Sequence, residues 1–103
     1  MKLSYLITVH NETDTLTRLL ERLINNRFDG DEIVILDDFS DNPKTQEILK
    51  QASSKINIVQ HKLDNNYGAH KNYGNSLCKG DWIFQLDGDE LPSIALICNI
   101  NHI

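Results

Sequence analysis

The sequence predicts an α/β fold, in which a parallel sheet is flanked by helices. Four short apolar segments, partly β-branched, alternate along the chain with three amphipathic helical patterns. This alternation is typical of strand–helix–strand units joined by right-handed crossovers. In addition, a polar cluster follows the first, second and fourth segments. Open α/β sheets place their ligands at the carboxyl ends of strands, so the clusters indicate a binding site there.

The bulk composition is that of one soluble domain, residues 1–103. A chain of 103 residues can bury a core but is short for two domains. Its hydrophobic fraction of 40% and charged fraction of 24% are ordinary for a globular protein. The net charge of −5 does not favour nonspecific attraction to nucleic acid or to an anionic membrane. We therefore expect no nucleic-acid partner.

The sequence contains no recognisable membrane or export signal. No segment approaches the roughly 20 apolar residues of a spanning helix, and the first 12 residues soon become polar. The two cysteines, Cys78 and Cys98, lack the spacing of a zinc site. We interpret them as inert, semi-buried thiols and expect a reducing, cytoplasmic location.

Residues 2–9 predict the first strand, and the first helix begins at Thr13. The strand segment is short, apolar and partly β-branched, and it breaks at residues 10–12. The helix ends before Gly30. Its apolar positions follow the stripe of an amphipathic helix: Leu16, Leu19, Leu20, Leu23 and Ile24.

The second strand and second helix follow the same logic. Residues 32–38 are a continuous apolar run closed by two aspartates, as expected for a strand covered on both faces. Asp41 or Asn42 can then cap a helix that has Pro43 at its first position. The residues that this helix turns inward are Ile48, Leu49 and Ala52.

The remaining elements have weaker signals. Residues 56–60 predict a third strand, followed by a polar loop at 61–68, and residues 81–86 predict a buried fourth strand. Between them we expect a helix that stops at Gly80, a typical C′ residue. Its inward positions are Ala69, Tyr73 and Leu77.

The tail begins with a helix-opening Pro92 and ends in the middle of an apolar pattern. Its apolar positions are Ile94, Ile97 and Ile100. Because the stripe is incomplete, we expect a truncated chain.

The cluster at the end of the fourth strand indicates a cation. Asp87 and Asp89 are two residues apart, and on an extended stretch they would point to the same side, about 6 to 7 Å apart at Cα. Oxygen ligands select hard ions such as Mg²⁺ or Mn²⁺, which bind substrate phosphates. The alternative is a polar turn in which Asp87 caps a helix.

Four motifs occur in the order found in a known family. They are "TVHNE" (8–12), "DDFSDNPKT" (37–45), "NNYGAHKNYG" (65–74) and "KGDWIFQLDGDE" (79–90). With these motifs the chain resembles the nucleotide-binding half of a family 2 glycosyltransferase. The resemblance implies the Rossmann-like GT-A fold with strand order 3-2-1-4, in which the first strand neighbours the fourth.

The resemblance also implies a reaction and its partners. A nucleoside diphosphate sugar, with a UDP-sugar favoured, would donate its sugar to a glycan, lipid or protein acceptor, with Mn²⁺ or Mg²⁺ and with inversion. The acceptor half and the catalytic base would lie beyond Ile103, so we assign no catalytic residue and expect nucleotide binding without transfer. The alternative is a noncatalytic nucleotide-sugar-binding module or an inactive fragment.

Three aspartates receive roles by this resemblance. Asp38 would contact the base and ribose, Asp87 the ribose or the metal, and Asp89 the metal that bridges the diphosphate. For Asp38, a turn or helix-capping role is the alternative.

The first loop would touch the nucleotide through Thr8, His10 and Glu12. His10 replaces the usual tyrosine of the family, which keeps an aromatic ring but loses the hydroxyl contact. Its alternative is a solvated loop histidine. Glu12 alternatively favours the N-terminus of the next helix through the helix dipole.

Two further positions depart from the family pattern. Lys71 replaces an arginine, so it offers positive charge to a phosphate without the two-point contact of a guanidinium. Ordinary surface residues are the alternatives for Lys71 and for the neighbouring His70. Phe39 replaces a glycine of the second motif, which puts the shape of that turn in question.

Overall fold

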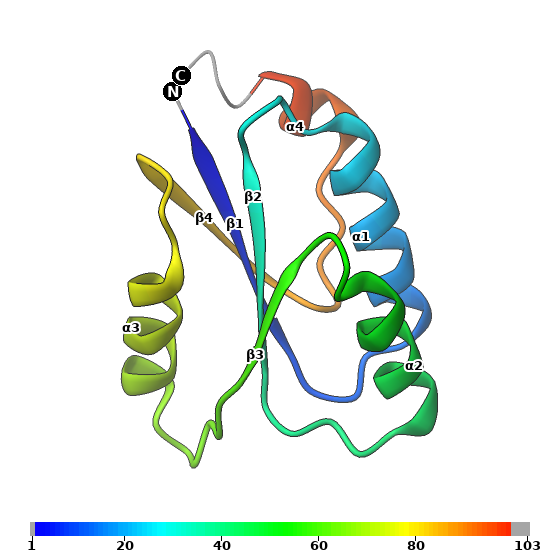
Figure 1. The fold of residues 1–103 in the computed structure, drawn as a ribbon, viewed down its shortest axis with the longest axis vertical. Coiled ribbons are helices and arrows are strands. Elements are labelled where there is room, and N and C mark those ends of the chain that lie inside the picture. Colours follow the sequence, from blue (N-terminus) through cyan, green and yellow to red (C-terminus); the bar gives the residue numbers. More distant parts are fainter. Residues whose placement is uncertain (1, 100–103) are drawn as a thin grey trace.

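The computed structural model describes residues 2–99 as one α/β layer structure. In chain order the elements are β1 (Leu3–Val9), α1 (Asp14–Asn26), β2 (Glu32–Asp37), α2 (Pro43–Ala52), β3 (Asn57–Gln60), α3 (Tyr67–Leu77), β4 (Trp82–Asp87) and α4 (Ile94–Asn99). The strands pair in parallel in the order β3-β2-β1-β4 (Figure 1). The predicted fold class and strand order are therefore confirmed.

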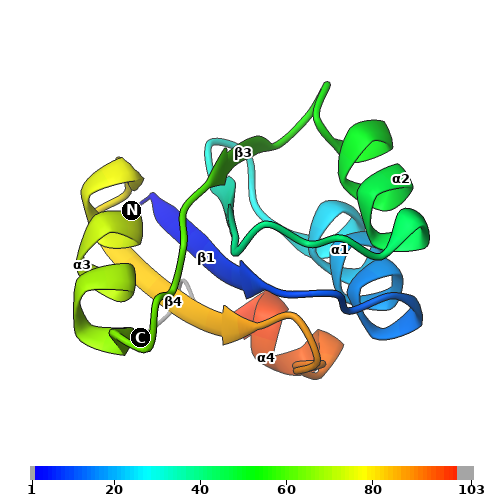
Figure 2. The same ribbon diagram turned by 90° about the horizontal axis from the view of Figure 1, so that it is seen from below.

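The two faces of the sheet are covered unequally. Helices α1, α2 and α4 lie on one face and α3 alone lies on the other (Figure 2). Because side chains alternate along a strand, Tyr5 and Ile7 enter the large core against α1, whereas Leu6 joins a small cluster with Val34 and Leu36 on the opposite face. The face that carries α3 thus holds the smaller apolar core.

Helices α1 and α2 form as their sequences predict. Four leucines of α1 are buried: Leu16, Leu19, Leu20 and Leu23. Asn42, rather than Asp41, caps α2, because its side chain accepts hydrogen bonds from the backbone N–H groups of Lys44 and Thr45. Pro43 occupies the first helical turn, where its missing N–H costs nothing.

The predicted inward face of α3 is confirmed only at Leu77, which packs against the small apolar cluster. Ala69 and Tyr73 are exposed, and the buried residues are His70 and Gly74. The reason is close packing at Gly74, where a Cβ atom would lie 2.9 Å from Leu6 Cδ2. The helix also begins earlier than expected, at Tyr67, after Asn66 caps it by accepting from the Ala69 N–H.

Gly80 does not serve as the C′ residue of α3. The helix ends at Leu77 with Cys78 as its C-cap. Instead, Gly80 passes close to β1: its N–H donates to Ser4 Oγ at 2.8 Å, and a Cβ atom would lie 2.7 Å from the Ser4 backbone nitrogen. Gly80 is therefore required by the close approach of two backbone segments.

Strand β4 is not buried as predicted. It pairs with β1 and forms an edge of the sheet that residues 2–99 build, which leaves Trp82 64% and Ile83 38% exposed. Leu86 is the buried residue of this strand. An apolar run at an edge has the same composition as one in the middle of a sheet, and this similarity misled the prediction.

The tail and the thiols depart partly from expectation. In α4, Ile97 is buried but Ile94 is 51% exposed, and Ile100 lies outside the described residues. Cys78 is partly buried as expected, whereas Cys98 is exposed on α4. No helix within residues 2–99 is long and apolar enough to cross a membrane.

Phe39, in the turn of the second motif, adopts a left-handed backbone conformation. Its φ of 45° lies in the left-handed region that favours glycine. The side chain is half exposed, so the bulky ring does not clash with the core. The backbone at Phe39 thus adopts a conformation suited to the glycine that stands there in the family pattern.

Two glycine substitutions test this packing. We expect Gly80→Ala to lower the free energy of unfolding by about 1–3 kcal/mol, because the new methyl group overlaps the backbone of β1. Gly68→Ala in α3 is the matched control, since the nearest atom to its Cβ is 3.8 Å away. The control should gain about 0.5 kcal/mol through helix propensity. Urea denaturation measures both, and equal effects of the two variants would contradict the packing account.

Candidate functional site

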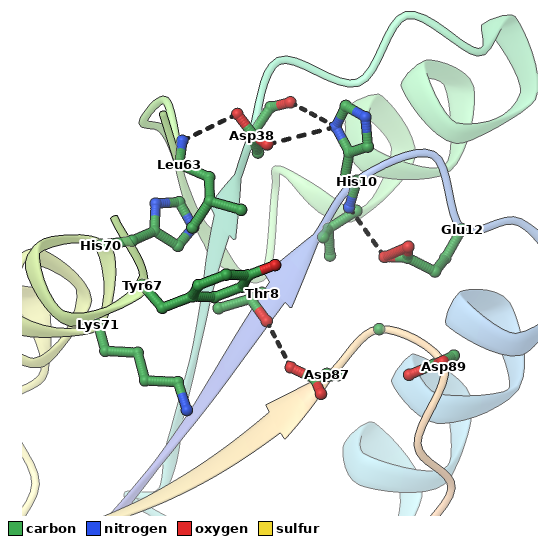
Figure 3. A pocket seen from close by; sticks show the side chains of 12 residues that line it. Thr8, His10, Glu12, Asp38, Leu63, Tyr67, His70, Lys71, Asp87 and Asp89 are labelled. Atoms are coloured by element: carbon green, nitrogen blue, oxygen red, sulfur yellow. Dashed lines mark hydrogen bonds and ion pairs between the residues drawn. The ribbon is translucent and has the colours of Figure 1, made fainter. Parts of the chain in front are cut away.

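A cavity of about 280 Å³ lies at the carboxyl ends of β1, β2 and β4 (Figure 3). All seven residues singled out in the sequence line it: Thr8, His10, Glu12, Asp38, Lys71, Asp87 and Asp89. The other lining residues are Val9, Leu63, Tyr67, His70 and Gly88. The structure therefore brings the four sequence motifs together around one space.

Strand register places two of these residues side by side. Thr8 of β1 pairs with Asp87 of β4, and Thr8 Oγ1 donates to Asp87 Oδ1 at 2.9 Å. Their chain neighbours Ile7, Val9 and Leu86 belong to the large core on the α1 face. Because successive side chains of a strand point to opposite faces, Thr8 and Asp87 point toward α3. The cavity consequently opens on the thinly covered face of the sheet.

Asp38 faces the cavity and does not take the capping role that was its alternative. Its Oδ1 accepts from the Leu63 N–H at 3.0 Å, which ties the loop after β3 to the end of β2. The turn is closed instead by the buried Asp37, whose Oδ1 accepts from Ser40 Oγ at 2.6 Å. Because Asn42 caps α2, Asp38 is left to contribute a carboxylate to the site.

His10 is exposed but held in place. Its Nδ1 lies 2.7 Å from the Asp38 carbonyl oxygen and 3.6 Å from Asp38 Oδ2. A carbonyl oxygen only accepts, so Nδ1 carries the proton. This hydrogen bond, together with the charges of Asp38, Glu12 and Asp41, raises the pKa of His10. His10 is therefore solvated, as in the alternative interpretation, but its ring is fixed by Asp38.

Glu12 connects the first loop to the turn after β4. Its Oε1 accepts from the His10 N–H at 2.8 Å and lies 2.5 Å from the position that a Cβ atom on Gly88 would occupy. Its partial burial, followed by the charges of Asp89 and Asp87, raises the pKa of Glu12, although the His10 N–H opposes this shift. The carboxylate thus packs against Gly88, rather than acting only through the dipole of α1.

The acidic segment is a turn and not the extended stretch that we predicted. The Glu90 N–H donates to the Asp87 carbonyl at 2.9 Å, and Glu90 Oε1 accepts from the Asp87 N–H at 2.9 Å. Asp87 and Asp89 both reach the cavity, but they do so from the two sides of Gly88. Within residues 2–99, no group of three or more His, Cys, Asp or Glu side chains is arranged to hold a metal.

Two further residues of α3 line the cavity, and one of them, His70, is not the surface residue that was its alternative. Tyr67 stands at the first position of α3 and is 68% exposed, so its ring is available for stacking. His70 forms part of the cavity wall and is only 4% exposed. The sequence does contain a signal for Tyr67, since Asn66 is a typical N-cap residue. Recognising this cap would have placed Tyr67 at the start of the helix and near the strand ends.

Sequence comparisons agree with the motif pattern. The family described as "Glycosyl transferase family 2" matches residues 4–100. An uncharacterized glycosyltransferase of Mycoplasma genitalium is 33% identical over 102 residues, covering 90% of this chain and 34% of the relative. Undecaprenyl-phosphate 4-deoxy-4-formamido-L-arabinose transferase of Edwardsiella ictaluri is 37% identical over 93 residues, covering 84% of this chain and 28% of the relative. The chain spans about a third of the length of these relatives.

Solved structures share the fold. TarS of S. aureus in complex with UDP-GlcNAc has a TM-score of 0.79 at 22% identity, covering 99% of this chain and 30% of that one. TarS in complex with UDP has a TM-score of 0.71 at 25% identity, covering 88% of this chain and 28% of that one. Mannosyltransferase PcManGT from Pyrobaculum calidifontis, in complex with GDP-Man and Mn²⁺, has a TM-score of 0.70 at 17% identity. The match covers 94% of this chain and 30% of that one. These likenesses confirm the expected GT-A fold.

The geometry predicts that His10 and His70 titrate on opposite sides of the ordinary histidine pKa of 6.5. The Asp38 carbonyl bond and nearby carboxylates raise the pKa of His10, whereas burial and the neighbouring His61 lower that of His70. Imidazole resonances followed by NMR over pH measure both values. In Asp38→Asn the pKa of His10 should fall, because a negative charge is lost while the carbonyl remains. A pKa of His10 below that of His70 would contradict the geometry.

Proposed function

Because the chain belongs to glycosyl transferase family 2, we propose that its cavity binds the nucleoside diphosphate part of a sugar donor. A UDP-sugar is the donor we favour. The observation that carries the proposal is that aspartates line the cavity at two separate places. Asp38 lies just after β2, and the pair Asp87 and Asp89 lies at the end of β4 and in the turn after it. These would serve the nucleoside and the diphosphate respectively.

The nucleoside would bind at the Asp38 end of the cavity. A carboxylate forms strong hydrogen bonds with a uracil N–H or ribose hydroxyls. His10 and Tyr67 add two exposed aromatic rings for stacking on the base. The UDP found in the TarS structure of 25% identity supports this assignment.

The diphosphate would bind between Lys71 and the acidic turn. Asp87 and Asp89 are exposed oxygen donors, which fit a hard ion such as Mn²⁺ or Mg²⁺. Because residues 2–99 present no group of three metal-binding side chains, water and the phosphates would supply further ligands. When bound, such an ion stabilises negative charge on the leaving diphosphate. Lys71 would add a positive charge from α3.

The reaction we propose is transfer of the sugar, with inversion, to an acceptor hydroxyl on a glycan, lipid or protein. Asp38 and Lys71 would orient the donor, and holding reactants in place supplies much of the catalytic advantage. We assign no residue to the base that deprotonates the acceptor. The free thiols Cys78 and Cys98 fit a reducing location such as the cytoplasm, which we also propose.

The proposal predicts that substitution of Asp89 weakens UDP binding only when metal is present, whereas substitution of Asp38 weakens it with or without metal. Asp89→Asn should weaken UDP binding by about tenfold or more with Mn²⁺ present and should change nothing in chelator, because the ion depends on ligand charge. Asp38→Ala should weaken binding by about 1–3 kcal/mol under both conditions, because a charged hydrogen bond to the nucleoside is lost. Isothermal titration calorimetry of each variant with UDP measures these effects.

Asp29→Asn is the matched control, since it removes an exposed carboxylate from the turn before β2. That turn precedes the amino end of the strand, whereas the cavity lies at the carboxyl ends. The control should bind UDP like the unsubstituted chain. An Asp89→Asn variant that retains full metal-dependent affinity would refute the metal role, and an Asp38 effect seen only with metal would refute the nucleoside role.

A further inference from the structure

We propose that His61 is a positioning residue for nucleotide binding, although it is not among the residues that line the cavity. Its ring holds His70, and with it the first turns of α3, against the end of β2. The inference rests on the proposed function, because it takes the nucleotide as the ligand whose binding is positioned.

Helix α3 needs such an anchor because it carries much of the cavity wall on little buried surface. It contributes Tyr67, His70 and Lys71 to the cavity. Its buried residues are His70 and Gly74, and it packs on the small apolar cluster rather than the large core. Few buried apolar contacts mean a low local free energy of opening. Polar and aromatic contacts near the cavity therefore matter for where this helix sits.

His61 provides these contacts from a fixed backbone position. Its N–H donates to the Asp37 carbonyl at 2.9 Å, which fastens it to the end of β2. Its Nδ1 lies 2.9 Å from His70 Nδ1, and its ring stacks on Tyr73 with centroids 4.3 Å apart and planes at 18°. His70 and Tyr73 are three residues apart and so lie on adjacent turns, which means that one ring holds α3 at two points.

The same loop also reaches the nucleoside end of the cavity. Two residues after His61, the Leu63 N–H donates to Asp38 Oδ1. Residues 61–63 therefore connect the carboxylate assigned to the nucleoside with the helix that carries Tyr67 and Lys71. Loss of the contact between His61 and His70 would release α3 from this connection while leaving every cavity residue chemically unchanged.

The contact between the two rings depends on a single shared proton. One Nδ1 donates and the other accepts, so the bond exists when at most one ring is charged. Burial of His70, and then the neighbouring His61, lower the pKa of His70, while Asp38 and the Lys62 carbonyl oppose this shift. Titratable groups on the adjoining elements are Tyr73 and Lys71 on α3, Lys62 in the loop and Asp37 at the end of β2. The bond is therefore fully present above pH 6.5 and is lost as the pH falls through the lowered pKa of His70.

Two variants separate the hydrogen bond from the aromatic ring. His61→Phe keeps the ring that stacks on Tyr73 but has no nitrogen, whereas His61→Asn keeps a side-chain N–H near the place of Nδ1 but has no ring. Calorimetric titration with UDP and Mn²⁺ at about pH 7.5 should show affinity lower by about five- to tenfold in His61→Phe and by at most about threefold in His61→Asn. Thermal unfolding of each variant verifies that it is folded.

The pH profile distinguishes positioning through the proton from a merely structural role. The ratio of the UDP dissociation constants of His61→Phe and the unsubstituted chain should fall toward one as the pH is lowered from about 7.5 through the lowered pKa of His70, because the unsubstituted chain then loses the same bond. Ionisation of the UDP phosphates affects both proteins equally, so it cancels in the ratio.

Each failure has a distinct meaning. Equal UDP affinities of the unsubstituted chain and His61→Phe at the higher pH, or a ratio that stays constant over pH, would overturn the positioning role and leave the proposed function standing. Absence of UDP binding by the folded, unsubstituted chain would overturn the proposed function and this inference with it.

Discussion

The parallel pairing of β1 with β2 on one side and β4 on the other is the constraint on which the site depends. It aligns Val9 with Asp37 and Thr8 with Asp87, so that the three strands end together. The pairing continues past the strand ends, where the Asp38 N–H donates to the Val9 carbonyl and the Gly88 N–H donates to the Thr8 carbonyl. Backbone hydrogen bonds of the sheet, rather than loop side chains, therefore position the two acidic clusters.

The unequal covering of the sheet explains where the cavity lies. The large core against α1, α2 and α4 holds the strands together on one face. On the opposite face, α3 approaches the sheet at Gly74 through the small cluster around Leu6 and Leu36. Stability is thus concentrated on one face, while the face with α3 retains room for a ligand.

The sequence was sufficient for the fold class, because the strand segments and the leucine stripe of α1 are strong periodic signals. It was not sufficient for features that depend on neighbours in space. The buried side of α3 follows from a glycine that no apolar pattern contains, and the exposed Trp82 follows from the place of β4 at the sheet edge. The spacing of Asp87 and Asp89 is the same in a strand and in a turn, so composition could not separate the two.

The site shows the same division between local pattern and tertiary contact. All seven residues that were assigned roles from the motifs line the cavity, because three motifs include the end of a strand and the fourth includes the start of α3. The contact between His61 and His70 was missed, because it joins a loop to a helix. No sequence pattern indicates that the two rings meet, since their separation depends on how α3 packs. Lys71 and Tyr67 likewise reach the cavity only because α3 is held in that position.

NMR of the isotope-labelled chain with UDP tests the central claim most directly, which is that one cavity at the strand ends binds the nucleotide and its metal. With UDP and Mg²⁺, the amide resonances of Asp38 and Leu63 should shift. Replacing Mg²⁺ by paramagnetic Mn²⁺ should then broaden the amides of Asp87, Gly88 and Asp89 and leave that of Asp29 sharp. Shifts concentrated away from the carboxyl ends of β1, β2 and β4, or broadening as strong at Asp29 as at Asp89, would contradict the account.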